Sequence, residues 1–242
     1  MMDSVEVLPG ISIFNDLCLY LESDGLLAMA DLHVGYEAAL EEEGVHLPRF
    51  QTATIQDAIV EIMDKHEPEA VLINGDIKHE FSRNLGQEWS DVKFILSLLR
   101  ERAKVILIRG NHDNYLKNIA SRLDIEILDT GRFGGMTFVH GHSQCSERPL
   151  IMAHEHPSVR IVDRVGAAVK LPCFVHFRND DVIVMPAFSP LAAGTNIAGV
   201  EPSEFLSPIL RECDVTQTSV YGCSEIGILN LGSIPFLGEM KV

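Results

Sequence analysis

The chain has 242 residues, of which 46% are hydrophobic and 22% are charged, and its formal net charge at pH 7 is −16. This composition supplies ample material for a buried core. The negative charge argues against a broad, non-specific surface for nucleic-acid backbones, but it leaves room for a local binding pocket. No apolar run has transmembrane length, and the first residues, MMDSVEVLPG, lack the pattern of a signal peptide. We therefore expect a cytoplasmic protein with no membrane partner.

The first half of the chain alternates between strand-like and helix-like patterns. Short apolar runs at 26–30, 70–73 and 105–108 predict three strands. Apolar residues at helical spacing predict two helices between them: Ile55, Ile59, Ile62 and Met63 within 50–66, then Val92, Ile95, Leu96 and Leu99. This order predicts crossover units on a largely parallel sheet.

The second half consists of short β-rich pieces separated by turn residues, at 137–139, 150–153, 182–185, 219–221 and 226–229. No linker rich in Pro, Gly or Ser divides the two halves. We therefore expect two sheets that share one core, with residues 1–242 forming a single domain.

The five cysteines are scattered along the chain and contain no CxxC pair. This pattern argues against a disulfide framework and against a thiolate zinc site. We expect them to be mostly buried thiols in a reducing compartment.

Each predicted strand of the first half ends in residues that bind metals or transfer protons: Asp31-Leu32-His33, Gly75-Asp76 and Gly110-Asn111-His112-Asp113. The second half adds His140-Gly141-His142 and His154-Glu155-His156. Open α/β sheets assemble their sites at the carboxyl ends of strands, and residues two apart on an extended backbone point the same way. Asp, Asn and His together suit a pair of divalent metals. The same groups buried without an ion would be costly to desolvate.

These blocks resemble, in order, those of the calcineurin-like metallophosphoesterase family: Asp31-Leu32-His33, Gly75-Asp76, Gly110-Asn111-His112-Asp113, His140 and Ala153-His154-Glu155-His156. They span about half of the chain. In its general character the sequence is similar to the small prokaryotic ICC-like group, including members encoded beside DNA ligases or helicases. The resemblance implies an α/β fold, a four-layer α/β/β/α sandwich of two mixed sheets.

The resemblance also implies a two-metal centre. By position, Asp31, His33, Asp76 and His156 would hold the first metal, and Asp76, Asn111, His140 and His154 the second. Nitrogen and oxygen ligands without thiolate fit manganese, our expected metal, with iron, cobalt or zinc as alternatives. A hydroxide activated by both metals would attack phosphorus in line, because the pair of cations draws in phosphate and acidifies a shared water.

His112 is the expected catalytic residue, since the resemblance places its counterpart beside the substrate, where an imidazole can support the leaving oxygen. His79 stands where many relatives carry an Asp that orients this histidine. His79, His142 and Arg109 are candidate substrate contacts. Lys78, Arg83 and Arg148 are further candidates for a phosphate clamp. The segment 185–197 either lines the cleft or connects strands.

Three functions remain open on the sequence alone. The first is a phosphodiesterase or nuclease-like enzyme that acts on nucleic acid or nucleotides. The second is a phosphomonoesterase for a small metabolite or phosphoprotein, and the third is an inactive scaffold. Inactive scaffolds usually lack the catalytic histidine or a ligand, and neither His112 nor any ligand is missing here, so the scaffold is disfavoured. Of the two enzymes, we favour the phosphodiesterase, and the relative activity on bis-p-nitrophenyl phosphate and p-nitrophenyl phosphate would discriminate them. The relatives' gene neighbours also suggest an association with DNA-repair proteins.

Overall fold

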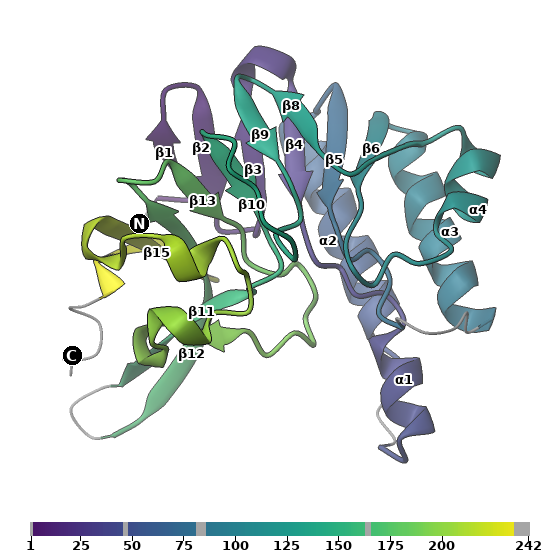
Figure 1. The fold of residues 1–242 in the computed structure, drawn as a ribbon. Coiled ribbons are helices and arrows are strands. Elements are labelled where there is room, and N and C mark those ends of the chain that lie inside the picture. The colour runs from purple at the N-terminus through teal and green to yellow at the C-terminus, as the bar shows by residue number, and fades with distance from the viewer. Residues whose placement is uncertain (1, 46–47, 81–85, 163–165, 235–242) are drawn as a thin grey trace.

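Two β-sheets are stacked face to face in the computed structural model, which describes residues 2–45, 48–80, 86–162 and 166–234 (Figure 1). The first sheet has seven strands in chain order: β1 (Ser4–Leu8), β2 (Ile11–Phe14), β3 (Leu19–Leu21), β4 (Leu26–Met29), β5 (Ala70–Asn74), β6 (Lys104–Ile108) and β7 (Glu126–Leu128). Strands β1 to β4 pair antiparallel, whereas β4 to β7 pair parallel. The parallel part is the crossover region that the sequence predicts.

The second sheet has nine strands: β8 (Gly131–Phe133), β9 (Met136–Phe138), β10 (Leu150–Met152), β11 (Pro157–Val162), β12 (Ala168–Phe177), β13 (Val182–Val184), β14 (Thr195–Asn196), β15 (Thr218–Ser224) and β16 (Gly227–Gly232). Their order is β14-β11-β12-β13-β10-β9-β8, with β15 on β12 and β16 on β15. Strands β9, β10 and β13 are parallel to one another. Both sheets are therefore mixed. In both, parallel strands lead into the candidate site residues that the sequence analysis names.

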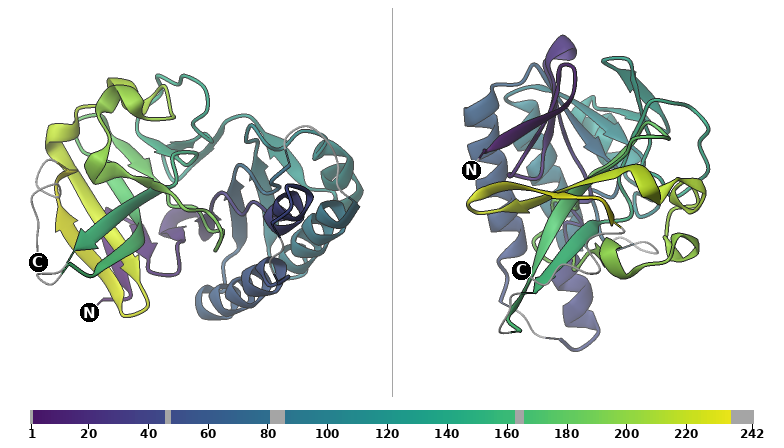
Figure 2. Two further views of the ribbon diagram at one scale, coloured as in Figure 1. Left: turned by 90° about the horizontal axis from the view of Figure 1, so that it is seen from below. Right: turned by 90° about the vertical axis from the view of Figure 1, so that its left-hand side faces the viewer.

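The helices cover the outer face of the first sheet (Figure 2). They are α2 (Gln51–His66), α3 (Gly86–Arg100) and α4 (Lys117–Ala120), whereas α1 (Tyr36–Glu42) has no buried residue and projects beyond the end of the sheet (Figure 1). In β5, Val71 and Ile73 pack against the helices, while Leu72 between them packs toward the second sheet. Because side chains alternate between the faces of a strand, a strand buried on both faces must be a continuous apolar run.

Short 3-10 helices form the outermost layer over the second sheet. Phe205 and Ile209, beside η4 and η5, pack in one apolar cluster with strand residues such as Val182. The 3-10 helices of this layer are η3 (Ile197–Gly199), η4 (Pro202–Glu204), η5 (Leu210–Glu212) and η6 (Val215–Gln217), whereas η1 (Glu22–Asp24) and η2 (Ser121–Leu123) connect elements of the first half of the chain. The predicted α/β/β/α sandwich is confirmed, with a fourth layer built from these turns in place of long α-helices.

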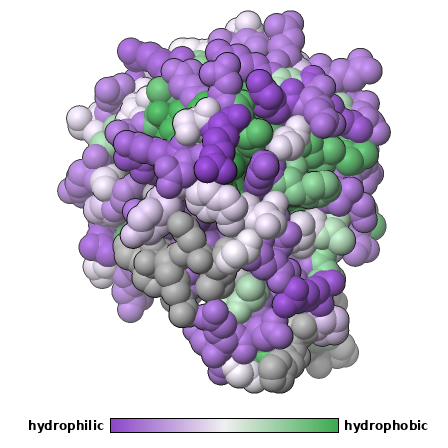
Figure 3. Space-filling model, turned by 90° about the vertical axis from the view of Figure 1, so that its right-hand side faces the viewer, coloured by the Kyte–Doolittle hydropathy of each residue, from purple (hydrophilic) through white to green (hydrophobic). Residues whose placement is uncertain are grey.

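The surface of the helical side is largely hydrophilic, and its hydrophobic residues gather in small patches (Figure 3). Phe94 on α3 is one of the exposed large hydrophobic residues there. All five cysteines are free, and four of them are buried. No helix in the described part of the chain combines the length and apolar character needed to cross a membrane.

Candidate metal centre

The polar residues that end five separate strands meet in one cluster. Asp31 and His33 follow β4, Asp76 follows β5, Asn111 and His112 follow β6, His140 follows β9, and His154 and His156 follow β10. Three groups have possible ligand atoms within 4.8 Å of one another: Asp31, His33 and His156; His33, Asp76 and His112; and Asp76, His140 and His154. Asn111 joins them, because its Oδ1 lies 3.1 Å from Nε2 of His140. All seven residues expected as ligands are thus brought together.

The backbone at these residues is not extended, in contrast to the sequence prediction. Five of them have positive φ: Asp31 (53°), His33 (45°), Asp76 (46°), His154 (68°) and His156 (47°). Non-glycine residues seldom adopt this region, which costs about 1–3 kcal/mol each and is found mostly at functional sites. Hydrogen bonds between the loops help to hold it. The His33 amide donates to the Asp76 carbonyl oxygen at 2.9 Å, and the His154 amide donates to Asp31 Oδ2 at 3.1 Å.

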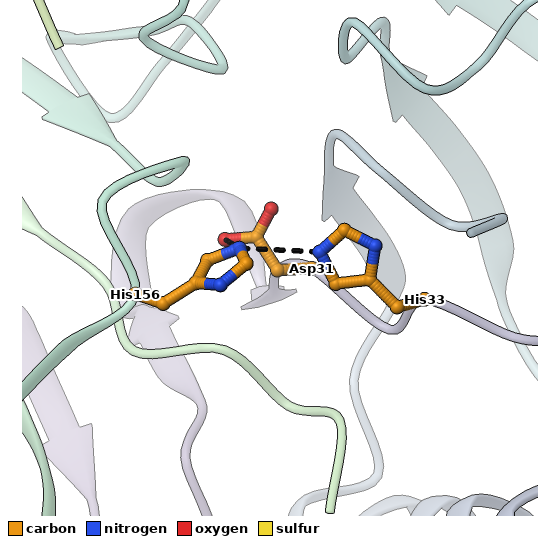
Figure 4. Close-up of side chains that lie close together, drawn as sticks. All are labelled: Asp31, His33 and His156. Carbon is orange, nitrogen blue, oxygen red and sulfur yellow. Dashed lines mark hydrogen bonds and ion pairs between the residues drawn. The ribbon is translucent and has the colours of Figure 1, made fainter. Parts of the chain in front are cut away.

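The first group has the chemistry of a cation site (Figure 4). Nε2 of His33 and Nε2 of His156 lie 3.2 Å apart, and Asp31 Oδ2 lies 3.4 Å from the same His156 nitrogen. Asp31 Oδ1 is buried and has no hydrogen-bond partner among the described residues. A buried carboxylate oxygen without a partner is costly, and a bound cation would satisfy it.

The second group centres on Asp76 and His140. Asp76 Oδ2 lies 3.2 Å from His140 Nε2, and His140 Nδ1 lies 3.2 Å from the carbonyl oxygen of Asn74. If Nδ1 donates to that carbonyl, Nε2 is left with a lone pair for a metal, which is the usual arrangement around a ligating histidine. Asp76 belongs to two of the three groups, so its carboxylate is placed to be shared.

Two glycines make room for these contacts. A Cβ at Gly75 would overlap the His140 ring, and a Cβ at Gly110 would overlap the Asp76 carboxylate. Glycine is therefore needed at both positions, because any side chain would collide with the cluster.

Burial and mutual contacts set the charge of the cluster. Burial raises the pKa of the Asp76 carboxyl, but the hydrogen bond from His140 and the charges of His140, His112 and His33 together outweigh burial and hold the pKa well below its usual range. Burial lowers the pKa of His33 to about 3 and, with help from the charge of His140, that of His154 to about 4. Burial also opposes protonation of His140, but Asp76 and Asp31 outweigh it and raise the pKa of His140 to about 9. A metal at His140 would therefore displace a proton.

Asp113 is a structural member of the site to which the sequence analysis gave no role. Its buried Oδ2 accepts the amides of Asp76 at 2.9 Å and Gly110 at 2.8 Å, and its Oδ1 accepts the Ile77 amide at 3.0 Å. Burial and the charge of Asp76 raise the pKa of Asp113 to about 6, against the effect of these donors. Asp113 thus ties the loop after β5 to the loop after β6. The sequence signal that could have indicated this role is that Asp113 belongs to the Gly110–Asp113 block.

His112 lies beside the cluster and is oriented through His79. The Nδ1 atom of His112 contacts the carbonyl oxygen of His79, and its Nε2 lies 3.9 Å from Asp76 Oδ2. The ring of His79 itself stacks on Tyr36, with ring centroids 3.8 Å apart. Burial, assisted by His112, lowers the pKa of His79 to about 4. The orienting contact expected from an Asp at this position therefore comes from a backbone carbonyl.

A buried carboxylate holds the loop that supplies this carbonyl. Glu88, near the start of α3, accepts the amides of His79 at 3.0 Å and Glu80 at 2.7 Å through Oε1. Its Oε2 lies 3.8 Å from Nζ of Lys78, and both side chains are almost fully buried. Gly35 packs so closely against Glu88 that a Cβ there would overlap it. No sequence pattern pointed to Glu88.

The candidate substrate contacts lie at different distances from the cluster. His142 is exposed, with its ring centroid 5.4 Å from that of His140. Arg109 pairs with Asp129, with Nη1 and Oδ1 3.1 Å apart, so a substrate would have to compete with that ion pair. The roles of His79, His142 and Arg109 in substrate binding stay predictions.

The wider phosphate clamp is not supported as predicted. Lys78 is buried against Glu88 and does not present its ammonium group at the surface. The guanidinium of Arg148 donates to the carbonyl oxygens of Cys145 at 3.0 Å and Glu147 at 2.7 Å. Arg83 lies outside the described residues.

The donor set fits divalent cations. It combines carboxylate, amide and imidazole groups, and it includes Asp31 Oδ1, which has His140 Nδ1 at 3.7 Å but accepts no hydrogen bond within the described part of the chain. Oxygen and nitrogen donors without thiolate are typical of sites for metals such as manganese, iron, cobalt and zinc.

Comparisons with known proteins identify the family and the fold. The family model described as calcineurin-like phosphoesterase matches residues 26–214. No curated protein matches the sequence. The crystal structure of Pseudomonas putida nuclease MPE is similar, with a TM-score of 0.69 and 21% identity, over 94% of this chain and 98% of that one. Yfce, a phosphoesterase from E. coli, has a TM-score of 0.41 and 17% identity, over 70% of this chain and 83% of that one.

The family match covers most of the chain, including all five sequence blocks. The similarity to the Pseudomonas putida structure shows the same fold. The chain belongs to the calcineurin-like phosphoesterase family and is a hydrolase of phosphoric esters.

Proposed function

We propose that this protein is a metal-dependent phosphodiesterase that acts on nucleic acid or nucleotides. The observation that carries the proposal is that the Asp76 carboxylate lies close to His140 and His154 on one side and to His33 and His112 on the other, while His33 also belongs to the group with Asp31 and His156. Centres of this kind suit in-line displacement at phosphorus. The fold shared with Pseudomonas putida nuclease MPE supports a diester over a monoester.

Two divalent metals would be held by the clustered side chains, with manganese as the expected ion and iron, cobalt or zinc as alternatives. Asp31, His33, Asp76 and His156 would bind the first, and Asp76, Asn111, His140 and His154 would bind the second. When bound, the metals supply positive charge for the phosphate oxygens and lower the pKa of a water molecule.

The protein's own residues then position and protonate the ester. Asp76, Asp31 and their imidazole partners would hold the metals, and in this way they would fix where the phosphate can lie. The contact between His112 Nδ1 and the His79 carbonyl oxygen directs the other ring nitrogen toward Asp76 and the substrate side of the cluster. There His112 Nε2 can hold a proton and give it to the leaving oxygen, which is general-acid support.

The test of this function is a reconstitution experiment. The full chain is stripped of metal with a chelator, reloaded with manganese, iron, cobalt or zinc, and assayed on bis-p-nitrophenyl phosphate, p-nitrophenyl phosphate and single-stranded DNA. We expect hydrolysis of the diester to exceed that of the monoester, with manganese giving the highest rate. Clear preference for the monoester, with no cleavage of DNA, would overturn the phosphodiesterase proposal in favour of a phosphomonoesterase.

Two further proposals concern the protein as a whole. We propose that residues 1–242 form one domain, since the cluster between the sheets contains residues from both halves, such as Leu72 and Ile183. A single cooperative thermal transition is the expected result. The cytoplasmic location and the association with DNA-repair proteins stay predictions.

A further inference from the structure

A cavity of about 470 Å³ lies next to the candidate metal centre. Its walls come from α2, the β2–β3 turn, β11, β12 and residues 187–194, and His156 is part of its lining. Pockets for small organic ligands have volumes of roughly 300–1,000 Å³. The cavity is therefore large enough for a ring system, and it shares a wall with the first ligand group.

The segment that closes this cavity is attached to the metal centre. The Phe188 amide donates to the Ala30 carbonyl oxygen at 2.8 Å, and the Ser189 amide donates to the Asp31 carbonyl oxygen at 3.2 Å. Ser189 Oγ also accepts from Gln51 Nε2 at 3.1 Å, and the same nitrogen donates to the His33 carbonyl oxygen at 2.8 Å. The 187–194 segment, which the sequence left as either a cleft wall or a connection, thus lines a space beside Asp31 and His33.

The lining favours an uncharged, flat group. Leu17, Ile62, Phe188 and Pro190 contribute apolar surface, and Ala58 leaves space. Burial of such surface gives about 25 cal/mol per Å². A ring without a formal charge could gain from these contacts.

A second phosphate would find little support in the cavity. Lys170 is the only Lys or Arg among the described lining residues, and its Nζ donates to the Gly194 carbonyl oxygen at 2.6 Å. Asp16 and Glu61 also line the cavity and would repel an anion. The phosphate therefore belongs at the metal centre, and the cavity suits the organic part of the ester.

We propose that this cavity binds the ring of the ester group that stays on phosphorus, a nucleobase or another aromatic group, while the phosphate lies at the metal centre. This assignment rests on the proposed phosphodiesterase function. His112 serves the leaving oxygen, whereas His156 lies in the cavity wall, so the retained ester group is the one that faces the cavity. The proposal names an aromatic phosphodiester as the substrate class.

The test compares two diesters with the same leaving group, phenyl p-nitrophenyl phosphate and methyl p-nitrophenyl phosphate. We expect the manganese-loaded protein to prefer the phenyl diester in kcat/KM. Ala58→Trp and Ala193→Trp each introduce a large ring at a lining position, the first on α2 and the second in the 187–194 segment. Each should lower the phenyl-to-methyl ratio of kcat/KM by about tenfold, chiefly through KM for the phenyl diester. Ala53→Trp is the matched control, because Ala53 is exposed on the same helix and does not line the cavity.

The outcomes separate the two proposals. Hydrolysis of neither diester by the unmodified protein would overturn the proposed function, and the cavity assignment with it. Hydrolysis of both, with the same phenyl-to-methyl ratio in Ala53→Trp, Ala58→Trp and Ala193→Trp, would overturn the cavity assignment alone. If only one filling variant misfolds, as judged by circular dichroism, the other decides the matter.

Discussion

The metal ligands and the catalytic histidine are held in place in different ways. The ligand loops are linked to one another directly: the His154 amide donates to Asp31, and Asp113 joins the loops after β5 and β6. The backbone amide of His112 also donates to Asp76 Oδ1, at 2.8 Å, but its side chain contacts the carbonyl oxygen of His79. That carbonyl belongs to a loop whose amides are held by Glu88, on a helix outside the cluster.

This difference means that metal binding and turnover should be separable by mutation. Changes within the ligand cluster should remove both, because the ligands share atoms and loops. Changes along the path from Glu88 to His112 should lower turnover and leave the metals in place. Four variants test this division.

Asp76→Asn should have the largest effect. Asp76 belongs to two ligand groups, so replacing its carboxylate by an amide weakens both candidate metal positions at once. We expect loss of bound metal and of diesterase activity, measured by mass spectrometry of the metals after dialysis and by the p-nitrophenol assay. Asp64→Asn is the matched control, since its exposed carboxylate pairs with Arg102 and neither residue is among the candidate site residues. Full metal content in Asp76→Asn would contradict the shared-ligand assignment.

His112→Ala should lower kcat by about 10²–10⁴-fold, the range for loss of a general acid or base. Because His112 lies beside the ligands and is not one of the seven assigned to metal, the metal content should stay at the level of the unmodified protein. Metal content is measured by mass spectrometry after dialysis, and activity by the p-nitrophenol assay. Loss of metal would instead make His112 a ligand, a role that its proximity to His33 and Asp76 would allow.

The first half of the fold could be predicted because its signals are local. The predicted runs at 26–30, 70–73 and 105–108 correspond to β4, β5 and β6, and the helix predicted within 50–66 is observed as α2. In contrast, β12 was missed. It contains Lys170 and Pro172, and the half of the strand before Cys173 is largely exposed, so its buried apolar residues are confined to the second half and do not mark a ten-residue strand.

The site could be predicted in its residue types but not in its backbone. The spacing of His154 and His156 suggested one extended strand, whereas both residues have left-handed backbone conformations held by contacts with other loops. Glu88 was missed for a related reason. A Glu near the start of a helix usually faces solvent and interacts with the helix dipole, and only its tertiary contacts show that it is buried.

Removing the Glu88 carboxylate should have an intermediate effect. Glu88→Ala combined with Lys78→Met removes the acceptor of the His79 and Glu80 amides without leaving a buried ammonium group unpaired. We expect kcat to fall about tenfold or more with metal content unchanged, because the support of His112 is loosened. Glu88→Gln in the same Lys78→Met background is the rescue variant, since its amide oxygen can still accept both amides. Equal activity in the two double variants would argue against this positioning role.

His79→Ala should have the smallest effect on turnover. The substitution keeps the backbone carbonyl that contacts His112 and removes only a ring stacked on Tyr36. If the carbonyl is what orients His112, kcat should change by no more than about twofold, well below the loss expected for a general acid. The value of KM answers a separate question, because a rise in KM at constant kcat would support the predicted contact between the His79 ring and the substrate. A fall in kcat as large as that of His112→Ala would mean that the ring, rather than the backbone held by Glu88, orients the catalytic histidine.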